Sequence, residues 1–244
     1  MTVFYGQQGA DEFFRHLLLL GSGYLDDTLG HSISCTAYIC LEMMARNDQN
    51  PWPAVATLAD YYCKGGFQSM PEMEKSDMVI NAHTLENQLW KATSGKGIVN
   101  LHHTITFYTL EQVRRFLSKN EYEHALSACV EFVGEKEKES IKFEKGSASQ
   151  TNDFSAFYKI FSRLDGKAVV GSLQEMIPSV EGRRQLGRFL IRAVCETVKG
   201  DYNPHDFTGI GSALWVVNNY WSRPMLAMNA LYQYLDYFFA GQKN

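Results

Sequence analysis

The sequence predicts an all-α fold, a single-domain bundle of about ten helices. Apolar residues recur at the three- and four-residue spacing of helices over most of the 244 residues. Short clusters of Gly, Ser, Asn or Pro separate these periodic segments, as expected for helix ends. Only Thr2 to Tyr5 looks strand-like, and four residues are too few to make a sheet.

The composition excludes several classes of protein. Apolar residues make up 45% of the chain and charged residues 20%, which excludes disordered and low-complexity classes. The 23 Lys and Arg residues against 27 Asp and Glu residues give a net charge of −4. This charge offers no overall attraction for nucleic acid or for an anionic membrane, so we expect neither as a partner.

The first half of the chain contains six predicted helices. The first places Phe13, Phe14 and Leu17 on one stripe and ends at Gly21-Ser22-Gly23. A Pro51-Trp52-Pro53 break presets the start of the third helix. The predicted segments are Ala10 to Leu20, Ser32 to Arg46, Pro53 to about Cys63, 72 to 93, Thr104 to Leu117 and Tyr122 to Val133.

The second half adds five predicted helices, and the last two are rich in aromatic residues. Such helices usually pack a core, although they also suit the wall of a pocket for a flat aromatic ligand. The predicted segments are Phe154 to Leu164, Ala168 to Met176, Gly182 to Val198, Phe207 to Tyr220 and Met225 to Phe239.

Residues 134–153 differ from the rest of the chain, being charged and then small and polar. We interpret them as an exposed linker within one domain of residues 1–244; a solvated helix end followed by a loop explains them equally well. The longest aliphatic run, Leu17 to Leu20, is far shorter than the roughly 20 residues of a membrane span. Five cysteines without a CxxC pair favour reduced thiols. We therefore expect a cytoplasmic protein.

Three histidines share a local pattern that predicts a metal site. His31, His103 and His205 each open a predicted helix, with an apolar residue two positions later and a hydroxyl-bearing residue three positions later. Neutral imidazole is the commonest metal ligand in proteins, so we predict these three as ligands, with His83 or a carboxylate as the fourth. His102 is adjacent to His103, so at most one of the two faces the same site.

Other motifs support fewer functions. Arg184, Arg188 and Arg192 form a basic stripe that suits an anionic ligand, but a solvated face paired with Glu181 and Glu196 is the simpler interpretation. The sequence contains no phosphate loop, no dinucleotide fingerprint, no GxSxG and no HExxH motif. We therefore predict no nucleotide cofactor.

Several short segments, which together cover about a third of the chain, form a recognisable pattern. They are Gly23-Tyr24-Leu25, Leu29-Gly30-His31, Cys35-Thr36-Ala37, Leu58-Ala59-Asp60-Tyr61-Tyr62, His205-Asp206-Phe207-Thr208-Gly209 with Ala213-Leu214, and the aromatic closing helix. In these segments the chain resembles a short, divergent member of the questin oxidase-like family. The resemblance implies an all-helical, Fe(II)-dependent oxygenase that acts on an aromatic polyketide-type small molecule. His31 and His205 match the family pattern best, and His103 matches its central histidine segment less closely.

The chain also departs from that family pattern. Where the family shows Gly-His-x-x-Lys, this sequence has Gly182-Arg183-Arg184-Gln185-Leu186, so Arg183 and Leu186 replace the histidine and the lysine. A site that uses that histidine and that lysine is therefore incomplete in this chain.

Two alternatives compete with the histidine metal site. The first is a metal-free helical module that binds a ligand or a protein partner, for which the histidines would not converge. The second is a helical diiron protein, which would need paired Glu-x-x-His segments. The chain contains that spacing once, from Glu121 to His124, so the diiron alternative lacks half of its ligands.

Overall fold

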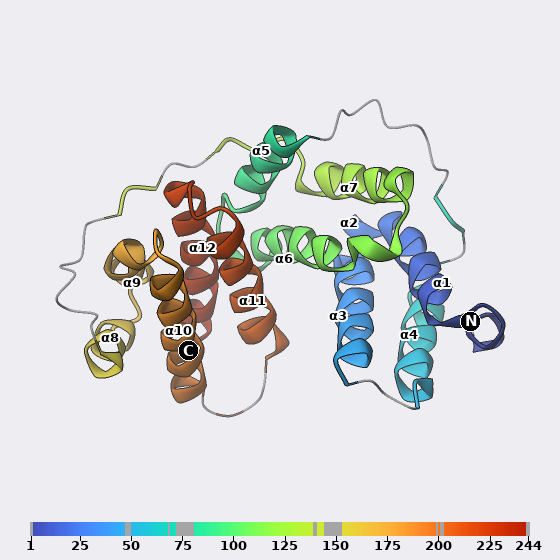
Figure 1. Cartoon of the computed structure of the whole chain (residues 1–244), viewed down its shortest axis with the longest axis horizontal. Helices are drawn as coiled ribbons and strands as arrows, with labels where there is room; N and C mark the ends of the chain where they lie inside the picture. The colour runs from blue at the N-terminus through green and yellow to red at the C-terminus, as the bar shows by residue number, and fades with distance from the viewer. Residues whose placement is uncertain are drawn as a thin grey trace. The chain divides into compact units, whose positions relative to one another are not determined.

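A computed structural model describes residues 2–46, 50–67, 69–71, 81–138, 141–143, 153–198, 200 and 203–242 (Figure 1). These residues form helices α1 to α12 and two short 3-10 helices, with no strand among them. The predicted all-α class is therefore confirmed. The strand expected at Thr2 to Tyr5 is wrong, because these residues belong to the first helix, which bends at Gly9.

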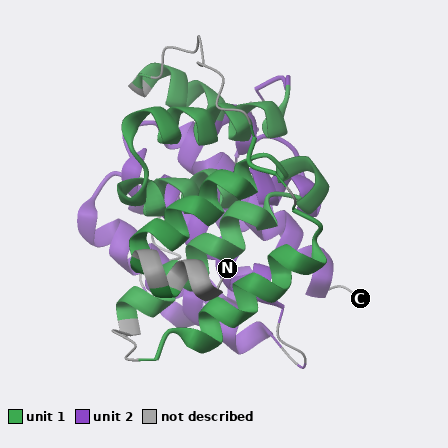
Figure 2. Cartoon of the chain, turned by 90° about the vertical axis from the view of Figure 1, so that its right-hand side faces the viewer, with its two compact units in different colours: residues 1–88, 105–134 green, residues 89–104, 135–244 purple. Residues whose placement is uncertain are grey.

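The chain divides into two compact units, which Figure 2 distinguishes by colour. Unit 1 comprises residues 1–88 and 105–134, and unit 2 comprises residues 89–104 and 135–244. The division between residues 134 and 135 falls at the start of the segment expected to be a linker. Of that segment, residues 134–138, 141–143 and 153 are described and are not helical.

Unit 1 is built around helices from the N-terminal third of the chain. Phe13, Phe14 and Leu17 of the first helix pack with Leu58 and Tyr62 in one buried cluster. The helices that lie wholly in this unit are α1 (Thr2–Ser22), α2 (Leu25–Thr28), α3 (His31–Arg46), α4 (Trp52–Lys64), η1 (Arg114–Phe116) and α7 (Lys119–Val133).

Unit 2 is built around the last two helices, which pack closely against each other. A Cβ atom added at Gly209 of α11 would lie 2.8 Å from the ring of Tyr234 in α12, so glycine permits this approach. Phe161 and Phe238 lie in the aromatic core, with ring centroids 5.9 Å apart. The helices that lie wholly in this unit are α8 (Phe154–Phe161), α9 (Gly166–Leu173), η3 (Gln174–Met176), α10 (Val180–Thr197), α11 (Pro204–Asn219) and α12 (Pro224–Gln242).

Two helices extend across the division between the units: α5 (Ala82–Ala92) and α6 (Gly97–Val113). The predicted start of α6 at Thr104 is wrong by about two turns, so His102 and His103 lie inside the helix instead of at its entry. Seven consecutive residues, 101–107, are buried. A helix that is buried all round lacks the apolar and polar alternation that would mark where it begins.

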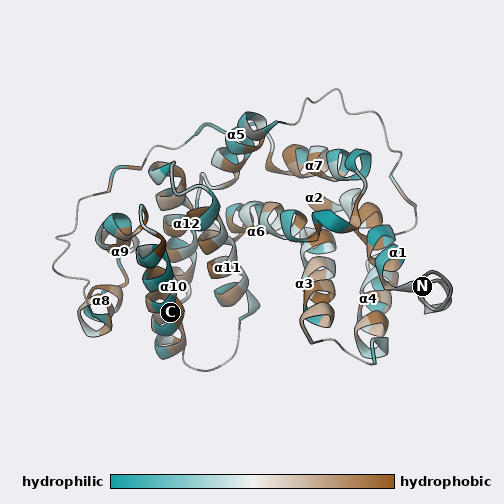
Figure 3. Ribbon diagram, in the orientation of Figure 1, coloured by the Kyte–Doolittle hydropathy of each residue, from teal (hydrophilic) through white to brown (hydrophobic). Residues whose placement is uncertain are grey.

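The helices differ in the hydropathy of their residues, as Figure 3 shows. The exposed face of α10 carries arginines, whereas every residue of α12 from Leu226 to Leu235 is buried. None of the helices in the described ranges combines the length and the apolar character needed to cross a membrane. Residues 72–80 of the predicted helix at 72–93 lie outside the described residues.

Candidate metal centre

Two histidines of unit 2 meet at their Nε2 atoms. His102 lies on α6 and is 2% exposed, and His205 lies in the first turn of α11 and is half-buried. Their Nε2 atoms are 3.0 Å apart, and the two rings are steeply inclined to each other. This pair unites two segments separated by about a hundred residues of sequence.

Hydrogen bonds at the opposite ring nitrogens define the tautomer of each histidine. The Nδ1 atom of His102 lies 2.8 Å from the carbonyl oxygen of Ile98, one helical turn earlier. The Nδ1 atom of His205 lies 3.0 Å from the side-chain oxygen of Asn203. Because both oxygens only accept, each Nδ1 carries the hydrogen, and in the neutral ring each Nε2 carries a lone pair.

The start of α11 explains why His205 takes this position. Asn203 is the N-cap residue, and its Oδ1 accepts from the backbone N–H of His205 at 3.0 Å. Pro204 occupies the first helical position, where its missing N–H costs nothing. The same amide of Asn203 donates through Nδ2 to the hydroxyl of Tyr237 at 2.7 Å.

Two lone pairs that face each other at 3.0 Å suit a cation placed against both. Burial lowers the pKa of His205, which favours the neutral ring that a metal requires. Histidine nitrogens bind transition metals at about 2.1 Å, so two ligands at roughly a right angle on one ion are about 3.0 Å apart. The observed separation therefore fits two ligands of one ion, and a shared proton is the competing occupant.

The neighbouring His103 takes part in a different contact. Its Nδ1 lies 2.5 Å from the ammonium of Lys136, which also donates to Oδ1 of Asn100 at 2.5 Å. Lysine only donates, so Nδ1 of His103 is the acceptor here. Burial, then Lys136, then His102 lower the pKa of His103 to about 3. In unit 2, the histidine whose ring meets His205 is thus His102, while His103 binds a lysine.

The other two predicted ligands belong to unit 1. His31 is the first residue of α3, as predicted, and is half-buried. It follows Gly30, whose φ of +78° and close approach to the Thr106 side chain exclude a larger residue. His83 is exposed near the start of α5, and its Nε2 lies 3.1 Å from Nδ2 of Asn87.

A buried carboxyl group is adjacent to the histidine pair in sequence. Asp206 is 6% exposed, and burial raises the pKa of its side chain. Its backbone carbonyl accepts from the hydroxyl of Tyr234 at 2.8 Å, which ties α11 to α12. This tie helps to hold the turn that carries His205.

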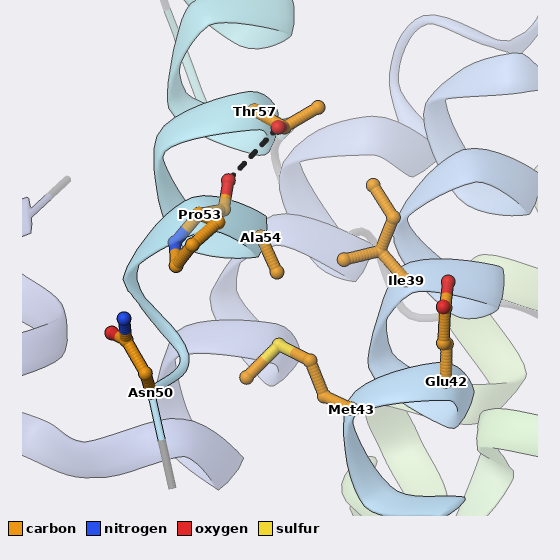
Figure 4. A pocket seen from close by; sticks show the side chains of 7 residues that line it. All are labelled: Ile39, Glu42, Met43, Asn50, Pro53, Ala54 and Thr57. Carbon is orange, nitrogen blue, oxygen red and sulfur yellow. Dashed lines mark hydrogen bonds between the residues drawn. The ribbon is translucent and has the colours of Figure 1, made fainter. Parts of the chain in front are cut away.

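Both units contain cavities away from the histidine pair. One cavity in unit 1, of about 450 Å³, lies between α3 and α4, and Figure 4 shows Ile39 and Met43 on one side of it and Ala54 on the other. One cavity in unit 2, of about 480 Å³, is lined by residues that include Lys167, Tyr232 and Asp236 of α9 and α12. Neither lining includes a histidine.

The arginine stripe on α10 is paired with acidic residues, as predicted. Arg184 lies 2.7 Å from Glu181, and Arg192 lies 2.8 Å from Glu196. Arg192 also covers the ring of Phe154. Exposed pairs of this kind contribute at most about 1 kcal/mol each.

Sequence reasoning left three residues of the centre out of the predicted set. His102 is adjacent to a predicted ligand, but the sequence alone does not say which of the two histidines turns toward His205. Asn203 carried an available signal, because Asn-Pro-His is the pattern of an N-cap followed by a first turn. Tyr237 gave no local signal, because its role depends on the packing of α12.

Comparison with known proteins adds no assignment. No family model, curated protein or solved structure matches this chain.

Proposed function

We propose that the protein is a metal-dependent oxidoreductase whose ion is held by His102 and His205. The observation that carries this proposal is the 3.0 Å separation of two Nε2 atoms whose rings both donate through Nδ1 to oxygens. Histidine ligands of metals typically have this outer hydrogen bond, because it selects the tautomer and orients the ring.

We also propose His31 as the third ligand. Two imidazoles alone leave a transition metal short of protein ligands, and catalytic sites commonly supply three. His31 is the residue that the sequence pattern and the family resemblance indicate for this position.

We propose Fe(II) as the ion and an aromatic small molecule as the substrate. Imidazole suits iron as well as zinc, copper and nickel, so the ligand set is compatible with this choice. A bound Fe(II) would supply dioxygen activation, the chemistry that the resemblance to questin oxidase-like proteins implies. The ring of Tyr237, 6.2 Å from that of His205, provides an aromatic neighbour for a flat substrate.

The protein's own residues supply orientation and a neutral ligand set. The Ile98 carbonyl and the Asn203 amide hold both rings with Nε2 directed at the same point. Burial of His102 limits access of water to one ligand. We propose that this centre operates in the cytoplasm, whose reducing conditions suit the free cysteines, including the exposed Cys63 and Cys195.

Metal titration tests the proposal. Protein prepared without a histidine tag is stripped with a chelator, loaded with Fe(II) under anaerobic conditions and assayed for bound metal. We expect about one ion per chain, and an affinity that falls more than about 100-fold in His205→Ala and in His31→Ala. His83→Ala, an exposed histidine in unit 1, is the matched control and should bind as the parent does. Circular dichroism checks that each variant keeps its helices.

The outcomes separate the parts of the proposal. A parent chain that binds no ion overturns the metal centre and favours a metal-free ligand-binding or interaction module. Loss of metal in His205→Ala but not in His31→Ala removes His31 from the ligand set. Iron-loaded protein that consumes no dioxygen with a panel of phenols and quinones overturns the oxygenase activity and leaves the metal centre standing.

A further inference from the structure

Asn203 has a place in unit 2 that its role as a helix cap does not explain. Its Oδ1 accepts twice, from the backbone N–H of His205 and from the ring Nδ1–H of the same residue, both at 3.0 Å. Capping requires only the first bond. The second reaches the imidazole itself and determines which ring nitrogen carries the hydrogen.

The orientation of the Asn203 amide is determined from both sides. A backbone N–H only donates, so the atom that faces it must be the amide oxygen. On the other side, Nδ2 donates to the hydroxyl of Tyr237 at 2.7 Å. A flipped amide would set its NH₂ group against the backbone N–H of His205 and lose the cap.

The two histidines differ in how their tautomers are selected. His102 donates to the main-chain carbonyl of Ile98, which no side-chain substitution removes. His205 donates to a side chain. If His205 carried its hydrogen on Nε2 instead, it would donate to Nε2 of His102 at the observed 3.0 Å, and the pair would have no site for an ion. The hydrogen bond from His205 to the Asn203 side chain is therefore what keeps the Nε2 lone pairs of both histidines directed at a shared ion.

We propose that Asn203 is a positioning residue of the metal centre, which selects the Nδ1–H tautomer of His205 and directs its Nε2 at the ion shared with His102. Tyr237 assists by holding the amide in place. The inference rests on the proposed function, because it assigns an outer residue to the same centre. Outer hydrogen-bond partners of this kind typically change metal affinity by about 10- to 100-fold.

Two substitutions at this position separate capping from positioning. Asn203→Ser keeps a good N-cap, but its hydroxyl is one atom shorter than the amide and does not reach the ring. Asn203→Asp keeps both the cap and an acceptor for Nδ1–H. We expect Asn203→Ser to bind Fe(II) or Co(II) about 10- to 100-fold more weakly, and Asn203→Asp to bind at least as tightly as the parent. Thermal unfolding of the two variants should be similar.

The tautomer is measured directly in the metal-free protein. Long-range ¹H–¹⁵N correlation spectra distinguish an Nδ1–H ring from an Nε2–H ring. We expect His205 to be Nδ1–H in the parent and in Asn203→Asp, and Nε2–H in Asn203→Ser. Tyr237→Phe, which keeps the ring but removes the acceptor of the amide, should weaken metal binding only a few-fold, and it provides a second test if Asn203→Ser does not fold.

Metal binding and the His205 tautomer together distinguish a failure of the proposed metal centre from a failure of the role proposed for Asn203. A parent that is Nε2–H at His205, or an Asn203→Ser variant with the parent's tautomer and affinity, overturns the role of Asn203 while the metal centre stands. A parent that binds neither ion, while the tautomer changes as expected, overturns the centre and with it the positioning of a metal ligand, but leaves the tautomer control in place.

Discussion

His102 and His103 are adjacent on α6 and buried to a similar extent, yet the structure gives them opposite chemistry. His102 donates through Nδ1 to a main-chain carbonyl and presents Nε2 to another histidine. His103 accepts through Nδ1 from the ammonium of Lys136. The difference shows that the partner of one ring nitrogen decides what the other nitrogen offers.

The comparison also separates two uses of a buried imidazole. Burial and the Lys136 contact lower the pKa of His103 to about 3 and keep the ring neutral, and Lys136 also occupies Nδ1, which would otherwise be available to bind a ligand. The pair formed by His102 and His205 leaves two lone pairs directed at one point. The first arrangement is suited to packing and the second to binding a cation.

The largest expected effect comes from replacing each of the two adjacent histidines separately with glutamine. His102→Gln should lower the affinity for Fe(II) more than about 100-fold, because it removes a ligand, whereas His103→Gln should change it less than about 3-fold. Bound metal after dialysis at a fixed free concentration measures both. Equal losses of Fe(II) affinity in the two variants would contradict the assignment of His102, and not His103, as a ligand.

The second largest effect should come from disturbing the packing of α11 against α12, which supports the His102–His205 pair. In Gly209→Ala, the new Cβ would lie 2.8 Å from the Tyr234 ring and 3.1 Å from the Leu101 side chain, so either α11 or the Tyr234 ring must shift. We expect a loss of about 1–3 kcal/mol in the free energy of unfolding together with weaker metal binding. Urea unfolding measures the first. Gly187→Ala, where a new Cβ meets only ordinary contacts with Leu214, is the control.

The pH dependence of the free energy of unfolding tests whether His103 is neutral in the folded protein. Its folded pKa of about 3 is below the ordinary value of 6.5, so between these values the unfolded chain binds a proton that the folded chain does not. Stability should therefore fall as the pH is lowered from about 6.5 toward 3, by at most about 1.4 kcal/mol per pH unit for this one group.

Urea unfolding of the metal-free protein at a series of pH values measures this slope. His103→Gln should reduce the slope by the contribution of one proton bound only in the unfolded state. His16 and His205 have pKa values lowered in the same direction, so a smaller slope should remain. An unchanged slope in His103→Gln would show that this ring is protonated in the folded protein.

The smallest effect concerns the lysine itself. Lys136→Met removes a donor from His103 and Asn100, and we expect a cost of about 1 kcal/mol in stability. The pKa of His103 should rise, because Lys136 lowers it, but should stay below 6.5, because burial is the larger cause. NMR titration measures the pKa. Lys142→Met, an exposed lysine of the same segment, should change neither quantity.

Local sequence patterns are sufficient to predict the fold class and most helix positions. Periodic apolar residues and Gly, Ser and Pro breaks placed α3, α4 and α7 to α12 within a few residues of their observed bounds. Local signals suffice there, because an amphipathic face, a cap and a breaker all act within a few residues. The start of α6 was missed because a helix buried on all sides carries no such face.

The contacts of each histidine ring, in contrast, depend on how the folded helices pack. The sequence predicts that His205 lies in a first helical turn and that His102 and His103 point in different directions. Which of these two histidines faces His205 depends on where Ile98, Lys136 and Asn203 lie in space. Hydrogen-bond partners decide the tautomer of an imidazole, and these partners come from packing between segments far apart in the chain. Periodicity specifies a helix locally, whereas a ligand set depends on contacts that form only when the chain is folded.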